Sequence, residues 1–135
     1  MKNKNKHKLN YGNHEKLIAW QMADKLDEIV QEILKSVPKN EFEIRRQLDG
    51  ASDSVGSNIV EGYYSGSISE FIRFLRYARR SCGEVQERVM RLRRKSLLDE
   101  NLYEKFKPHC IKTGYIIDRL ISSLCDKRDN KDKEM

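Results

Sequence analysis

Apolar residues in the first half of the chain recur at alternating intervals of three and four positions, which keeps them on one helical face. The first such stripe predicts a helix over residues 14–36. Its members are Ala19, Ala23, Leu26, Val30, Ile33 and Val37. Pro38 predicts the end of this helix, because the residue before a proline avoids the helical conformation. Asn40 is the expected N-cap of the next helix.

A second stripe predicts a helix from about Glu41 to Gly62. Its members are Ile44, Leu48, Ala51, Val55, Asn58 and Gly62. The stretch "SVGSNIVEG" (54–62) is rich in serine and glycine, but helix propensity is a weak guide where packing favours a helix. We therefore expect the break to come only in "GYYSGS", residues 62–67.

The longest stripe predicts a third helix that begins at Ser67 or Ser69. Its members are Ile68, Phe71, Leu75, Ala78, Cys82, Val85, Val89 and Leu92. Ser67 and Glu70 have the spacing of a capping box. The opposite face of this helix is rich in arginine and carries Arg73, Arg76, Arg80, Arg91 and Arg94.

A fourth helix is predicted after Asp99, its expected N-cap. The apolar stripe assigned to it is Leu102, Phe106, His109, Thr113, Ile116, Leu120 and Leu124. Four amphipathic helices with short connections predict an all-α, up-down-up-down antiparallel four-helix bundle over residues 14–126. We expect residues 1–13 to form a flexible basic arm and residues 127–135 a disordered charged tail.

Composition narrows the class of protein. The chain has 135 residues, enough for one domain with a core, and 36% of them are charged. No apolar run approaches the roughly 20 residues of a membrane-spanning helix, so no membrane is expected among the partners. Three widely spaced cysteines, Cys82, Cys110 and Cys125, are an odd number and predict reduced thiols in a cytoplasmic protein.

The sequence lacks the patterns of a catalytic or metal centre. Neither a Cys-x-x-Cys pair, a Glu-x-x-His pair nor two histidines at helical ligand spacing occurs. His109 lies on an apolar stripe, where a hydrogen-bonded structural role is favoured over catalysis. The cysteines are predicted to be small buried side chains. We therefore predict a protein that is not an enzyme and needs no metal or cofactor.

Charge is distributed unevenly along the chain. Residues 17–63 carry five basic and nine acidic side chains, whereas residues 64–98 carry nine basic and three acidic ones. Arginine matches phosphate geometry and stacks on bases, so the arginine face of the third helix predicts binding of RNA or DNA. A second reading is that these arginines pair with the acidic surface of a neighbouring subunit, through Asp24, Asp27, Glu28 and Asp53.

Asn58 lies on a stripe of otherwise apolar or small residues. Such an asparagine commonly pairs across helices and sets their register. Glu61 is placed about one turn later and is expected to bond a neighbouring amide or arginine. We favour a structural role for both residues over a pocket shared with Ser57 and Tyr64.

Three stretches resemble the 23S rRNA intervening-sequence proteins, also called the four helix bundle protein family. They are "KLIAWQMA" (16–23), "VPKNEFEIRRQLDGASDSVGSNIVEG" (37–62) and "SEFIRFLRYARRSCGEVQERV" (69–89). The motif residues in them are Trp20, Asn58, Glu61, Gly62 and Phe71. The resemblance implies a homo-oligomer, commonly a ring of five bundles, that is associated with ribosomal RNA genes and has an RNA-binding role.

More distantly, the chain resembles the accessory variability determinant of diversity-generating retroelements. That resemblance implies a basic pentameric ring that engages a reverse transcriptase and its template RNA. Three hypotheses follow: an RNA-binding bundle that uses the five arginines, an accessory subunit of a reverse transcriptase, and a structural homo-oligomer without a nucleic-acid role.

Overall fold

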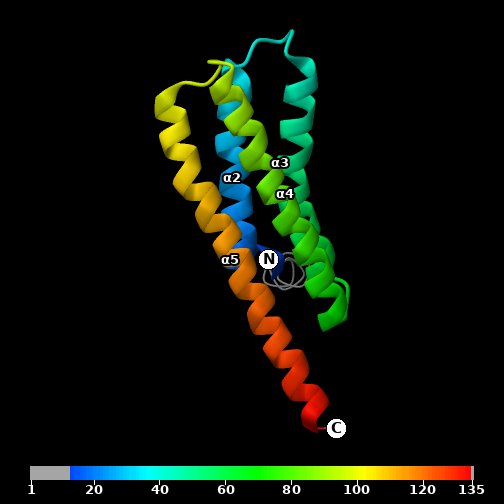
Figure 1. Ribbon diagram of the computed structural model, residues 1–135. Helices are drawn as coiled ribbons and strands as arrows, with labels where there is room; N and C mark the ends of the chain where they lie inside the picture. The colour runs from blue at the N-terminus through cyan, green and yellow to red at the C-terminus, as the bar shows by residue number, and fades with distance from the viewer. Residues whose placement is uncertain (1–12, 135) are drawn as a thin grey trace, which may run out of the picture.

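Four long α-helices build the protein in a computed structural model that describes residues 13–134 (Figure 1). A short 3-10 turn, η1 (Asn13–Lys16), precedes the helices α2 (Ile18–Ser36), α3 (Phe42–Tyr63), α4 (Ile68–Arg94) and α5 (Glu100–Glu134). Residues 13–134 contain no strand, so the predicted all-α class is confirmed. The predicted basic arm lies outside the described residues except for Asn13. No helix in the described part is long and apolar enough to cross a membrane.

Each helix packs against two others. Consecutive helices run in opposite directions and lie side by side, and α5 also packs against α2 (Figure 1). The four helices therefore surround one core in the order of an up-down-up-down antiparallel bundle. The predicted assembly of several bundles into a ring stays a prediction.

The core contains the stripes predicted for the first two helices. On α2 every member from Ala19 to Val37 is buried, and on α3 every member except Asn58, which is half-buried. On α4 the stripe is buried from Leu75 to Leu92, while Ile68 and Phe71 lie at its partly exposed start. The spacing of apolar residues was therefore sufficient to orient these three helices.

The core-facing stripe of α5 differs from the predicted one. The buried residues are Tyr103, Phe106, Cys110, Thr113 and Ile117, again at intervals of three and four. Leu102, His109 and Ile116, which the sequence analysis placed on the stripe, lie at its half-buried edge. Because α5 carries apolar residues around most of its circumference, more than one stripe fits its sequence, and the packing partners decide between them.

The connection between α2 and α3 is stabilised by a side chain that the sequence analysis did not single out. Glu41, and not the predicted Asn40, occupies the N-cap of α3, and it makes no side-chain cap. The Arg45 guanidinium donates hydrogen bonds to the carbonyl oxygens of Leu34 and Val37, the latter at 2.8 Å. It thereby satisfies carbonyl groups that the end of α2 leaves without helical partners.

The other two connections follow their predicted caps more closely. The Ser67 hydroxyl accepts a hydrogen bond from the Glu70 amide at 3.3 Å, which is half of a capping box. The Glu70 carboxylate does not complete the box, because it binds Arg73 instead. Asp99 caps α5 by accepting from the Asn101 amide at 2.8 Å.

The C-terminal part of α5 extends beyond the other helices (Figure 1). Residues 127–134, predicted as a disordered tail, form the last turns of this helix. Extending an existing helix requires no new nucleation. Pairs such as Arg128 and Asp129, with 3.6 Å between Nε and Oδ1, accompany these turns.

Candidate nucleic-acid interface

The outer face of α4 presents the five predicted arginines to solvent. The turns of the helix divide them into two groups, here called the first cluster (Arg73, Arg76, Arg80) and the second cluster (Arg91, Arg94). Gly83, Glu84 and Glu87 separate the clusters on the same face, and both glutamates are exposed. The interface is therefore two basic clusters about 16 Å apart along one helix, measured from Arg80 to Arg91 at the rise of an α-helix.

Two of the five arginines have acidic partners. Arg73 binds Glu70 through two hydrogen bonds, of 3.0 and 2.7 Å, and these bonds lower the pKa of the Glu70 carboxyl. Arg94 lies 3.7 Å from a carboxylate oxygen of Glu87, a looser pair. Exposed pairs of this kind contribute little to stability, because water and salt screen their attraction.

The other three arginines keep their charge available. Within residues 13–134, no carboxylate lies at ion-pair distance from Arg76, Arg80 or Arg91. Arg76 approaches only the Cys125 sulfur, at 4.0 Å from Nη2. Arg91 lines a shallow groove of about 240 Å³ between the start of α3 and the end of α4.

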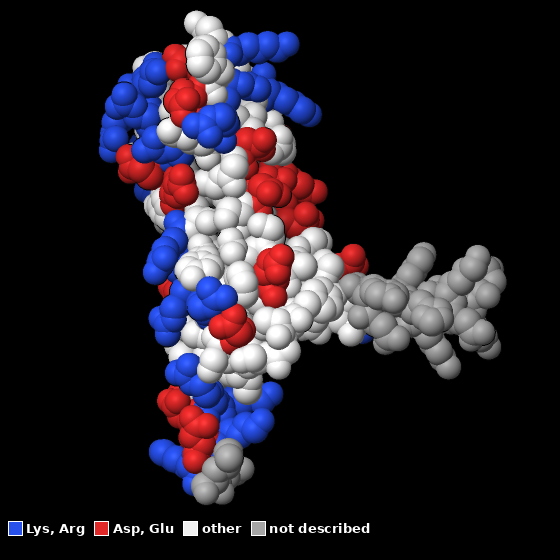
Figure 2. All heavy atoms as spheres, turned by 90° about the vertical axis from the view of Figure 1, so that its right-hand side faces the viewer, with Lys and Arg blue, Asp and Glu red and all other residues white. Residues whose placement is uncertain are grey.

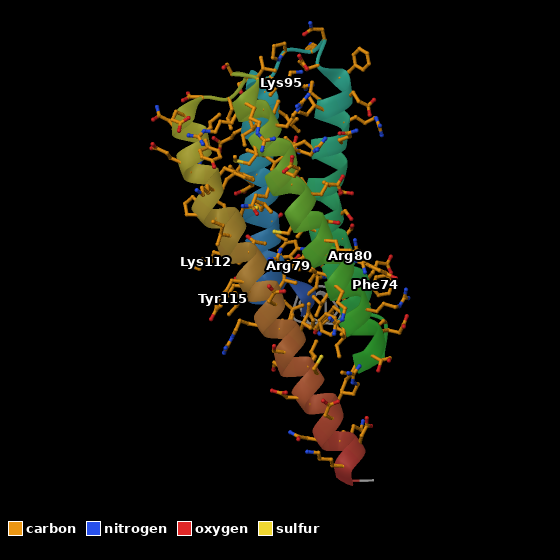
Figure 3. The ribbon with its side chains drawn as sticks, viewed as in Figure 1. Phe74, Arg79, Arg80, Lys95, Lys112 and Tyr115 are labelled. Carbon is orange, nitrogen blue, oxygen red and sulfur yellow. The ribbon has the colours of Figure 1, made fainter. Side chains whose placement is uncertain are left out.

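Three further arginines of α4 are bound to other helices. Arg79 donates to Asp118 of α5 at 3.0 Å, Arg88 donates to Gln47 of α3 at 2.9 Å, and Arg93 binds Glu100 at 2.7 Å. Figure 3 shows the distinction, since Arg79 points toward α5 while its neighbour Arg80 points away from it. Their positions beside the apolar stripe are the signal that separates these paired arginines from those on the opposite face of α4.

Aromatic rings that the sequence analysis did not assign to the site lie in the first cluster. The Arg73 guanidinium carbon is 4.7 Å from the centre of the Phe74 ring and 5.5 Å from that of Tyr77. Arg80 is also 5.5 Å from the Tyr77 ring centre. Helical spacing provides the missed signal, because positions 73, 77 and 80 are one turn apart.

The motif residues of the sequence analysis mostly serve packing. Gly62 is buried against α4, where a Cβ atom would come within 2.8 Å of Phe71 Cδ1 and 2.9 Å of Phe74 Cβ. At Gly56 a Cβ atom would fit without a clash, since its nearest neighbours, Ala23 Cβ and Trp20 Nε1, would both lie 3.9 Å away. The close approach between α3 and α4 therefore occurs at Gly62. The Trp20 ring packs edge-on against His14, with 5.1 Å between ring centres.

Asn58 bonds within its own helix. Its amide donates to the Ser54 carbonyl at 2.8 Å and lies 2.9 Å from the Ser54 hydroxyl. That hydroxyl is 2.9 Å from the Ser81 hydroxyl of α4, so Asn58 reaches the neighbouring helix only through Ser54. Glu61 is exposed, and its carboxylate has no bonding partner within the described chain. The register role predicted for Asn58 stays a prediction.

An acidic groove lies between α2 and α3, away from the arginine face. It has a volume of about 230 Å³, and its lining includes Trp20, Asp24, Asp27 and Asp53. Figure 2 shows the resulting separation: basic side chains follow one edge of the molecule and acidic side chains gather toward the other edge in the upper half.

Cys82, Cys110 and His109 occupy structural positions, whereas Cys125, which was also predicted to be buried, is half-exposed. The Cys82 and Cys110 sulfurs are buried between α4 and α5 and lie 3.9 Å apart. His109 Nε2 lies 2.9 Å from the Met22 carbonyl oxygen, a hydrogen bond that satisfies the ring. No group of three or more metal-ligating side chains is gathered within residues 13–134.

We expect a thiol reagent to modify about one thiol per chain in the native protein, because reactivity requires an accessible thiolate. That thiol is Cys125, which is half-exposed. The hydrogen bond between the buried sulfurs raises the pKa of Cys110 and lowers that of Cys82. Cys82 is therefore protected by its burial rather than by its pKa. A spectrophotometric thiol assay counts the reactive thiols, and we expect about one in native buffer and all three in denaturant. Native reactivity that survives Cys125→Ser would contradict the burial of the pair.

The chain matches a known protein family over most of its length. A family model described as 23S rRNA-intervening sequence protein matches residues 15–119. The match includes α2, α3, α4 and α5 as far as residue 119. A comparison with curated proteins finds no match.

Proposed function

The chain belongs to the 23S rRNA-intervening sequence protein family, and we propose that it is a non-enzymatic bundle that binds RNA through the outer face of α4. The residues proposed to contact RNA are Arg73, Arg76, Arg80, Arg91 and Arg94. Their role is to neutralise phosphates, which supplies most of the affinity in such complexes.

The observation that supports this proposal most is the unneutralised charge of Arg76, Arg80 and Arg91. Within the described residues, the arginines beside the core have partners on other helices, whereas these three project from an exposed face without a carboxylate. Repulsion among like charges on one helix face disfavours the free protein, and a polyanion relieves it. Guanidinium groups also match phosphate oxygens with paired donors.

A salt titration tests the proposal. Five phosphate contacts to a single strand predict a slope of about −3.5 in log affinity against log salt, so affinity should fall about a hundredfold from about 0.05 M to about 0.2 M salt. Fluorescence anisotropy of a labelled RNA measures this slope. Absence of binding at the lowest salt, or an affinity independent of salt, would exclude counterion release as the source of binding.

The acidic groove between α2 and α3 favours a second candidate function, self-association. Asp24, Asp27 and Asp53 border this groove beside the Trp20 ring, a setting that suits a guanidinium from another copy. Arginine side chains of α4 in a second bundle have the complementary charge. A head-to-tail contact between unlike surfaces forms a closed ring when its rotation permits. Light scattering, which measures the mass of the assembly, tests this second function. Self-association through these surfaces requires an oligomer that dissociates when the arginines of α4 are replaced by glutamate. The predicted reverse-transcriptase partner stays a prediction.

A further inference from the structure

The first cluster differs from an ordinary basic patch because two of its three arginines lie over aromatic rings. Arg73 lies over Phe74, and both Arg73 and Arg80 lie beside Tyr77. Phe74 and Tyr77 in turn meet edge to face, with 5.8 Å between ring centres. In Figure 3, Phe74 and Arg80 lie on the same side of α4, away from α5. Two rings and two guanidinium groups are thus gathered at one place.

Hydrogen bonds hold the Arg73 side chain in this cluster. Its Nε and Nη2 atoms donate to the Glu70 carboxylate, and its Nη1 donates to the Tyr77 hydroxyl at 2.9 Å. The side chain nevertheless remains 48% exposed. A guanidinium that is fixed in place and still open to solvent loses little further freedom when a ligand stacks on it.

Stacking of this kind selects one form of RNA. In an A-form duplex the base faces are covered by neighbouring bases, and the narrow major groove excludes side chains. Unpaired bases in loops, bulges and ends expose their faces, which stack on aromatic rings and on guanidinium planes. A purely electrostatic surface would instead favour the duplex, whose phosphates are more densely spaced.

We infer that the cluster of Arg73, Phe74, Tyr77 and Arg80 is a binding site for unpaired nucleotides, whose bases stack on its rings and guanidinium groups. This inference rests on the proposed RNA binding by α4. It assigns separate tasks to the two ends of the helix: the first cluster holds bases and phosphates, and the second cluster, Arg91 and Arg94, holds phosphates.

Tyr77→Leu tests the inference, because leucine keeps an apolar side chain but removes the ring. Affinity is measured for a labelled single-stranded RNA of mixed sequence and for the same strand annealed to its complement. Tyr77→Phe retains the ring but removes the hydroxyl that accepts from Arg73 Nη1, so it separates the contribution of the ring from that of this hydrogen bond. Tyr115→Leu is the matched control, since Tyr115 is 59% exposed on α5 and no arginine–ring contact includes it within the described residues. Circular dichroism establishes that each variant is folded.

The wild type is expected to prefer the single strand. Tyr77→Leu should weaken single-strand binding about tenfold, within the range measured for base–aromatic stacking. It should leave duplex binding and the salt slope unchanged, because no phosphate contact is removed. Tyr115→Leu should behave as the wild type, and Tyr77→Phe should lose less single-strand affinity than Tyr77→Leu because it keeps the ring. Equal loss for duplex and single strand, or an unaltered Tyr77→Leu variant, would overturn the inference while RNA binding itself stands. If the wild type binds neither RNA at low salt, the proposed function fails and the inference fails with it.

Discussion

The variant Arg91→Glu, Arg94→Glu is expected to bind RNA about a thousandfold more weakly than the wild type at about 0.05 M salt. Each reversal removes one phosphate contact and adds one repulsive charge, so two positions change the effective charge by four. Both side chains are exposed, and the one acidic partner, Glu87 beside Arg94, is loosely placed at 3.7 Å. The fold should therefore tolerate the change, and anisotropy measures the loss of affinity.

A control with the same change in net charge separates the site from general electrostatics. Arg46 on α3 and Arg119 on α5 are exposed and do not belong to α4. The variant Arg46→Glu, Arg119→Glu should lose much less affinity, since only long-range attraction is reduced. If both variants lose affinity equally, net charge rather than the second cluster determines binding. The proposed interface would then be incorrect.

Gly62→Val should lower the free energy of unfolding by about 3 kcal/mol, which is the upper end of the usual cost of overpacking. A Cβ at this position would lie 2.8 Å from Phe71 Cδ1 and 3.2 Å from the Phe71 carbonyl oxygen. A ring can rotate aside, but the backbone oxygen moves only if α3 and α4 separate. Denaturation followed by circular dichroism measures the change.

Gly50→Ala provides the opposite case on the same helix. No atom lies within 4 Å of a Cβ built at Gly50. Alanine should therefore stabilise the protein by about 0.5–1 kcal/mol, the ordinary gain in helix propensity over glycine. Gly62→Ala would receive the same propensity gain and should still be destabilising. A stabilising Gly62→Ala would show that α4 moves away at little cost, contrary to the packing described.

Much of the fold was predictable because apolar spacing determines which helix face is buried. The stripes of α2 and α3 and most of the α4 stripe were correct for this reason, and Ser67 and Asp99 were correctly placed as caps. The stripe of α5 was correct only at Phe106 and Thr113. Apolar residues lie around most of this helix, so tertiary packing decides which of them face the core. The role of Arg45 could not be predicted either, because its carbonyl partners at the end of α2 come close to it only in the folded protein.

The candidate site was predictable in outline but not in detail. Exposure of the five arginines followed from their positions opposite the apolar stripe. Their partners did not follow, because a pair such as Arg94 and Glu87 depends on side-chain conformation rather than spacing alone. The space required at Gly62 depends on where Phe71 and Phe74 cross from the next helix, which no local pattern in α3 reveals.

The acidic interruption at Glu84 and Glu87 has a consequence for the length of RNA that the proposed interface would hold. Two clusters on one rigid helix resemble a bidentate chelator with a fixed bite of about 16 Å. A short oligonucleotide can occupy only one cluster at a time, whereas a strand that spans both is held at the second by a high effective concentration. Affinity would then rise steeply at a threshold length rather than in proportion to length, and the glutamates would set that threshold.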